Sequence, residues 1–137
     1  MTTLTVVTEL AVPLICKAIP GVSGIYLFGS IGTPYETPAS DVDLAILPTK
    51  TISTLKCWKL AQKVAETVQR DVDLIDLLQA STVFRFQIIS TGKRIYCRDK
   101  NSCDRFEMTV YSTYLRFNEE RREILEDIKK RGRIYNG

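Results

Sequence analysis

Two short segments of the chain share a pattern in which aspartates alternate with apolar residues. The segments are DVDLAIL (residues 41–47) and DVDLIDL (residues 71–77). Alternation with a period of two is typical of a β-strand with one buried face, because successive side chains point to opposite sides of a sheet. Aspartate is disfavoured within strands. Its repetition in two similar strands therefore predicts a sheet that carries a functional site.

The rest of the chain alternates helices with short strands. Apolar spacing predicts an N-terminal helix that Pro13 kinks or delays, a helix over 51–69 and a short helix near 81–91. Short strands are expected at 25–28 and, at the edge of the sheet, at 93–97. This order predicts an α/β (α+β) fold with a small mixed sheet, covered by helices on one side and open for the site on the other.

The length of 137 residues suits a single domain. We expect residues 1–103 to form the catalytic α/β core and residues 104–131 to form one long C-terminal helix. The first half of that helix carries apolar residues that can cover the core. Beyond Phe117 charged residues dominate, and the sequence leaves open whether this half contacts a partner or faces solvent.

The composition excludes several classes of site. The chain has no histidine, which rules out Ser-His-Asp triads, Cys-His pairs and histidine-bound metals. Its four cysteines are scattered without a C-x-x-C motif and are expected to be reduced. A net charge of +3 does not indicate direct nucleic-acid binding. Without a long apolar run or a signal-like start, the sequence predicts a cytoplasmic protein with no membrane span.

Asp41 and Asp43 are predicted to share one face of the first strand, because they lie two residues apart. Two carboxylates held roughly 6 to 7 Å apart along a strand repel each other unless a positive charge sits between them. Hard oxygen ligands of this kind suit Mg²⁺ or Mn²⁺. The pair therefore predicts a divalent metal site.

A third carboxylate is expected from the second strand. Asp73 repeats the position of Asp43 in the shared pattern, and three carboxylates on neighbouring strands could hold two metal ions roughly 3.5 to 4 Å apart. Asp71 shares the face of Asp73 but lies nearer the start of the strand, whereas Asp76 falls on the opposite face. Asp73 is the favoured candidate, with these two as alternatives.

Gly29 and Ser30 follow the strand at 25–28, and ten residues separate Ser30 from Asp41. A glycine at the end of a strand lets the backbone approach a phosphate closely, and backbone N–H groups with the serine hydroxyl can donate to its oxygens. A Gly-Ser pair alone carries no information. Together with the three carboxylates, the Gly-Ser pair indicates a site for a nucleoside triphosphate and its metal ions.

This arrangement resembles the minimal nucleotidyltransferase branch of the DNA polymerase β superfamily. The signature of that branch is Gly-Ser, ten residues, Asp-x-Asp and a later aspartate on a strand, and Gly29, Ser30, Asp41 and Asp43 match its spacing. The element order from about residue 5 to residue 97 is also similar to that of the family. The small size and the charged C-terminal helix are most similar to MntA-type antitoxins, which are partners of HEPN-domain RNase toxins.

The resemblance implies a specific activity. Such antitoxins use ATP with Mg²⁺ to transfer AMP to a tyrosine of the toxin, which silences its RNase activity. By position, Asp41, Asp43 and Asp73 would bind the metal ions, and Asp73 would also act as base for the incoming hydroxyl. Gly29 and Ser30 would hold the β- and γ-phosphates. The resemblance also implies a complex between this chain and the toxin.

The loop between Ser30 and Asp41 departs from the family pattern. Family members commonly have a glycine four residues after the serine and an arginine in the loop. Here Pro34 occupies the first position, Gly32 comes two residues earlier, and the loop has no basic residue. Lys93 and Arg94 are candidates for neutralising the triphosphate by charge alone.

Two other functions stay open on the sequence. The chain could be an antitoxin that neutralises its toxin by binding without catalysis. It could also transfer a nucleotide to a small molecule, although 137 residues leave no room for a separate domain that builds a substrate pocket.

Overall fold

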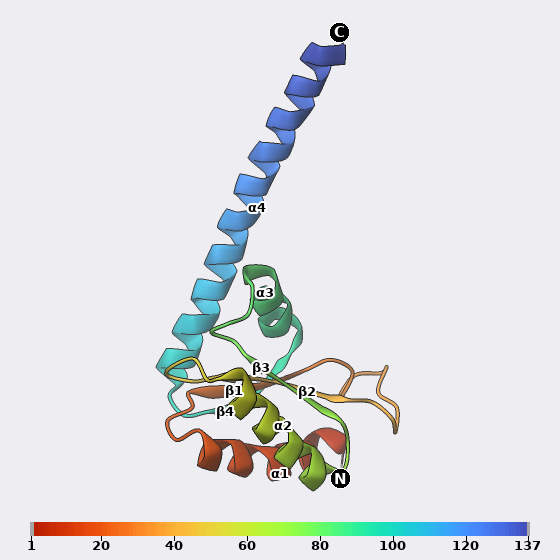
Figure 1. Cartoon of the computed structure of the whole chain (residues 1–137), viewed down its shortest axis with the longest axis vertical. Coiled ribbons are helices and arrows are strands. Elements are labelled where there is room, and N and C mark those ends of the chain that lie inside the picture. Colours follow the sequence, from red (N-terminus) through yellow and green to blue (C-terminus); the bar gives the residue numbers. More distant parts are fainter. Residues whose placement is uncertain (1, 137) are drawn as a thin grey trace.

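The computed structural model describes the backbone of residues 2–136 and the side chains of residues 2–131. This part of the chain forms four helices and four strands, which alternate except that β2 follows β1 directly (Figure 1). They are α1 (Thr3–Ala18), β1 (Gly24–Phe28), β2 (Val42–Leu47), α2 (Thr54–Val68), β3 (Val72–Asp76), α3 (Thr82–Thr91), β4 (Lys93–Cys97) and α4 (Lys100–Asn136). The helix containing Pro13 is not delayed, because it starts at Thr3 with Thr2 as its N-cap.

The four strands form one mixed sheet in the order β3-β2-β1-β4. Strand β1 is antiparallel to both β2 and β4, whereas β2 and β3 are parallel and connected through α2. The chain segment 93–97 is an edge strand, as predicted. The mixed sheet and the long C-terminal helix confirm the predicted fold class.

One face of the sheet is buried beneath α1 and α2. Val42, Leu44 and Ile46 of β2 are fully buried on this face, and they pack with residues of both helices. The helices contribute Val7, Ala11 and Ile15 from α1 and Leu60, Ala61 and Val64 from α2. This is the helical cover that the sequence predicts, and it fixes which side of β2 carries the aspartates.

The opposite face is not left open along its whole length, which corrects the expectation of cover on one side only. A second apolar cluster lies there and contains Tyr26, Ala45 and Leu47 of the sheet. Ile88 and Ile89 of α3 and Val110 of α4 complete it. The physical reason is that β2 carries aspartate on this face only at its start, and the later positions are apolar. The uncovered part is therefore confined to the end of the sheet that holds Asp43.

Helix α4 begins at Lys100, before the expected start near Asp104. Asp99 explains the earlier start, because its carboxylate accepts hydrogen bonds from the Asn101 N–H (3.1 Å) and from the Ser102 hydroxyl (2.9 Å). The helix then passes α3 and extends beyond the body of the domain (Figure 1). Within the described residues, none of the helices is long and apolar enough to cross a membrane.

Candidate active site

Asp43 and Asp73 lie side by side in the sheet. Their Cα atoms are paired in the parallel register of β2 and β3, so both side chains project to the same face. That face is the one toward α3, since Ala45 and Leu47 follow Asp43 on it. Asp43 is half-buried and Asp73 is exposed. The two aspartates that the sequence placed in separate strands are thus neighbours at the uncovered end of the sheet.

The electrostatic surroundings of Asp43 disfavour its charge. Burial, followed by the negative charges of Asp73 and Asp41, raises the pKa of the Asp43 carboxyl above its ordinary value. All three causes act on the ionised form, and a bound cation would relieve them. The site therefore concentrates negative charge that a bound cation could neutralise.

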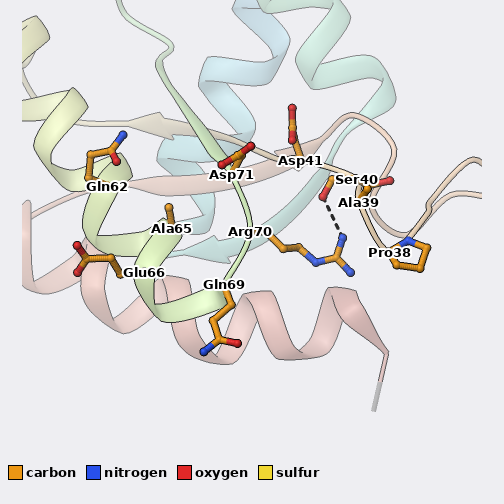
Figure 2. Close-up of a pocket in the computed structure, with 10 residues that line it drawn as sticks. All are labelled: Pro38, Ala39, Ser40, Asp41, Gln62, Ala65, Glu66, Gln69, Arg70 and Asp71. Atoms are coloured by element: carbon orange, nitrogen blue, oxygen red, sulfur yellow. Dashed lines mark hydrogen bonds between the residues drawn. The ribbon is translucent and has the colours of Figure 1, made fainter.

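Asp41 lies just before β2, exposed at the rim of a pocket of about 500 Å³. Figure 2 shows Asp41 and Asp71 on neighbouring segments at this rim. The remaining lining comes from residues 38–40 and from the end of α2 and the turn after it, including Glu66 and Arg70. Asp43 and Asp73 do not line this pocket. Asp41 connects the two places, because it lines the pocket and its charge also acts on Asp43.

Asp76 has a structural role. It is buried at the end of β3, and its carboxylate accepts from the backbone N–H groups of Ile52 (3.1 Å) and Leu78 (2.9 Å) and from the Gln79 side chain (3.0 Å). These donors hold the loop before α2 to the turn after β3. The alternative of Asp76 as third carboxylate loses its support, because its oxygens are already engaged on the far end of the strand.

Gly29 makes the closest approach to Asp43. It follows β1, whose last residue Phe28 is the register partner of Asp43. The backbone of Gly29 has φ +79°, and a Cβ atom there would lie 2.1 Å from an Asp43 carboxylate oxygen. The left-handed backbone favours glycine here, and a Cβ atom would have to displace the Asp43 carboxylate. The turn continues with the Thr33 N–H donating to the Ser30 carbonyl (3.0 Å).

The structure separates the two basic candidates of β4. Lys93 reaches toward the loop, with its Nζ 3.4 Å from where a Cβ of Gly32 would lie. Arg94 instead forms ion pairs with Asp104 (2.9 Å) and Glu107 (2.7 Å) of α4. Lys93 is therefore the candidate that lies beside the Gly29–Gly32 turn, and Arg94 anchors α4 to the sheet.

Arg70 is a residue that the sequence analysis missed. Its guanidinium donates to the carbonyls of Thr37 (3.2 Å) and Ser40 (2.9 Å), as the dashed contact to Ser40 in Figure 2 illustrates. It thereby ties the loop that lacks its own arginine to the segment before β3. No motif marks this contact, since the two segments are 30 or more residues apart in sequence.

The carboxylates suit an ion that keeps part of its hydration shell. Among the described residues, no three acidic or cysteine side chains converge closely enough to enclose a metal ion as they stand. Mg²⁺ is commonly bound by one or two carboxylates, with water and phosphate oxygens completing the octahedron. Asp43 with Asp73 or Asp41 meets that requirement next to a turn able to hold a phosphate.

Comparisons with known proteins agree with this geometry. The profile of the family described as polymerase beta, nucleotidyltransferase, matches residues 13–101. The chain is 35% identical over 117 residues to the protein adenylyltransferase MntA of Shewanella oneidensis, covering 85% of this chain and 84% of that protein. The region that the family profile matches contains the Gly-Ser turn and all the candidate carboxylates.

Solved structures of similar sequence share the fold. One is a toxin-antitoxin complex with AMP-PNP, with a TM-score of 0.80 and 34% identity over 88% of this chain and 97% of the other. Another is the tri-AMPylated HEPN toxin of S. oneidensis in complex with its MNT antitoxin, with a TM-score of 0.76 and 33% identity over 90% and 97% of the two chains. Sequence profile, curated relative and fold agree, and the chain belongs to the polymerase β nucleotidyltransferase family.

Proposed function

We propose that this chain is an antitoxin that transfers AMP from ATP to a tyrosine of a cognate HEPN-domain RNase toxin in the cytoplasm and so neutralises it. The observation that carries the proposal is the pairing of Asp43 with Asp73 beside the Gly29 turn. Support also comes from the similar chains, one called a protein adenylyltransferase and another solved with a tri-AMPylated HEPN toxin.

Asp41, Asp43 and Asp73 are the residues that would hold Mg²⁺, or Mn²⁺ in its place. The pKa of Asp43 supports this: burial, and then the charges of Asp73 and Asp41, raise it, and a bound cation would offset all three effects. When bound, the cation would supply charge for the triphosphate and lower the pKa of the attacking hydroxyl. The proposal includes a requirement for this ion.

The protein side of the reaction is positioning and proton transfer. The backbone of Gly29 and Ser30 would hold the β- and γ-phosphates, and Lys93 is the cationic side chain beside that turn. The tyrosine oxygen would attack the α-phosphorus, and the bond to the β-phosphate oxygen would break to release pyrophosphate. Asp73 would accept the hydroxyl proton, for which its exposed position on the open face is suitable.

Transfer of label from α-labelled ATP to purified toxin tests the proposal. The Asp41→Ala, Asp43→Ala double variant should lose transfer by at least about a thousandfold while it keeps the fold by circular dichroism. Asp71→Ala is the control and also tests the alternative third carboxylate: Asp73, not Asp71, is the register partner of Asp43, so transfer should persist. Labelling by the double variant at the wild-type rate would overturn the proposal, as would full activity in excess chelator.

One observation favours a second candidate, a binding antitoxin without catalysis. The exposed carboxylate of Glu36 accepts from the Gly32 N–H (2.8 Å), which places a negative charge on the turn expected to hold phosphate. The Gly32 N–H and a hydrogen bond to Thr3 lower the pKa of Glu36, so it is ionised at neutral pH. If this candidate is correct, the Asp41→Ala, Asp43→Ala variant will still protect cells from the toxin.

A further inference from the structure

A heptad-spaced stripe runs along α4 and continues past the body of the domain. Its members are spaced alternately by four and three residues, as in the a and d positions of a coiled coil. They are Val110, Tyr114, Phe117, Arg121, Ile124 and Ile128. Such spacing keeps one face of a helix toward a partner helix over its whole length.

The structure provides a partner for only the first part of the stripe. Val110 is 4% exposed in the cluster beneath α3, and the Tyr114 ring stacks on Phe86 of α3 with centroids 3.7 Å apart. Beyond this point the exposed fraction rises to 60% at Ile124 and 57% at Ile128. The distal stripe, defined as Phe117, Arg121, Ile124 and Ile128, thus continues a packed interface without a covering element of the described chain.

We propose that the distal stripe is the docking surface for a helix of the partner protein. The proposal rests on the proposed function for the identity of that partner, the HEPN toxin. Ile124 and Ile128 of the projecting helix are more than half exposed. Helices in proteins are stabilised mainly by packing of their apolar face, so this part of α4 gains little stability without a partner. Continuity with the α3 contact shows which face the partner helix would cover.

The charges beside the stripe disfavour a second copy of this chain as the occupant. In a parallel pair of α4 helices, Arg121 of each copy would meet Arg121 of the other at an a position. In an antiparallel pair, the flank formed by Glu120 and Asp127 would face the same acidic flank of the other copy. Either arrangement brings like charges together across the interface.

The same charges define the chemistry of the partner. Its helix should carry lysine or arginine beside its apolar stripe, opposite Glu120 and Asp127, and an acidic or polar residue opposite Arg121. Asp127 pairs at present with Arg131 across one turn (3.2 Å), and both side chains are largely exposed. An exposed pair of this kind is weak and can exchange for a pair with the partner.

Binding of the full-length chain to the HEPN toxin without ATP tests the proposal. The Ile124→Glu, Ile128→Glu variant should bind about 100-fold more weakly, because two central apolar anchors become charges. Leu115→Glu is the matched control, since Leu115 is 63% exposed on the same helix but lies off the stripe. It should bind within about threefold of wild type.

The readouts separate this proposal from the proposed function. Binding that depends on the distal stripe supports the docking surface whether or not AMP is transferred. Absence of AMP transfer would contradict only the proposed function. Equal binding by wild type and the Ile124→Glu, Ile128→Glu variant would overturn the docking proposal. A wild-type chain that sediments alone as a dimer, and a double variant that sediments as a monomer, would also overturn it.

Discussion

Replacing Asp43 by asparagine should stabilise the metal-free protein while it abolishes AMP transfer. Asp43 and Asp73 are Cα partners in parallel strands, with both side chains on one face. The pKa of Asp43 is raised by burial and by the charges of Asp73 and Asp41. An asparagine side chain has nearly the same shape as that of aspartate without the charge, so the substitution removes the repulsion and leaves the packing intact.

The size of the gain follows from the strand spacing. Neighbouring strands lie about 4.8 Å apart. Two unit charges about 5 Å apart repel by about 0.8 kcal/mol in water and by about 3 kcal/mol at an effective dielectric constant near 20. Asp73 is exposed, so solvent screens the pair and the lower figure is the closer one. A gain of about 1 kcal/mol corresponds to a rise in Tm of about 3 °C for a domain of this size.

The gain should depend on pH with a defined sign. Because the pKa of Asp43 is raised on folding, the folded state keeps its proton to a higher pH than the unfolded state does. The wild-type protein is therefore destabilised as the pH rises from the pKa of Asp43 in the unfolded state, about 3.9, through its higher pKa in the folded state. The Asp43→Asn variant has no such titration. Its advantage should be near zero in acid and reach its full size at neutral pH.

Thermal unfolding in chelator at a series of pH values measures the effect. Asp71→Asn is the control, because Asp71 lies next to the pair but is not among the charges that raise the pKa of Asp43. Its Tm should equal that of wild type. Added Mg²⁺ should raise the Tm of wild type and have little effect on Asp43→Asn. The reasoning is refuted if Asp43→Asn is no more stable than wild type at neutral pH. It is also refuted if the gain in Tm over wild type is as large in acid as at neutral pH.

Three further substitutions have distinct expected results. Asp76→Asn should lower the free energy of unfolding by about 2–3 kcal/mol in denaturant titrations, because an amide nitrogen replaces an oxygen that accepts from two donors; unchanged stability would show that these contacts are dispensable. Gly29→Ala should reduce AMP transfer at least about tenfold, because its Cβ would displace Asp43 and φ +79° strains alanine; a fully active variant would contradict this. Arg70→Met should speed hydrogen exchange in residues 33–40, because two loop carbonyls lose their donor; unchanged exchange would show that the loop is held otherwise.

The strands and the face that each strand buries could be predicted from local pattern. Alternation placed Val42, Leu44 and Ile46 on one side of β2, and the structure buries all three. The same pattern gave β3, and the Gly-Ser spacing led to the family that the comparisons confirm. These features depend only on neighbouring residues and a period of two, which is why sequence reasoning is reliable for them.

Contacts between distant segments could not be predicted in this way. The cover of the sheet face opposite α1 and α2 depends on where α3 and α4 pack. The apolar residues of these helices do not indicate which strands they contact. The contact of Arg70 with the loop and the separation of Lys93 from Arg94 depend on the sheet order β3-β2-β1-β4. The roles proposed for the carboxylates remain predictions that the labelling experiment tests.

Asp43 of β2 and Asp76 of β3 differ in how the fold compensates their charge. Asp76 is buried and is given three hydrogen-bond donors, so its charge is compensated within the fold. Asp43 is half-buried, and its burial, followed by the charges of Asp73 and Asp41, raises its pKa. A fold under selection for stability alone would not keep an uncompensated, half-buried acid near the start of a central strand, where an apolar or amide side chain would cost less. This cost is the one expected if Asp43 serves the cation of the proposed function.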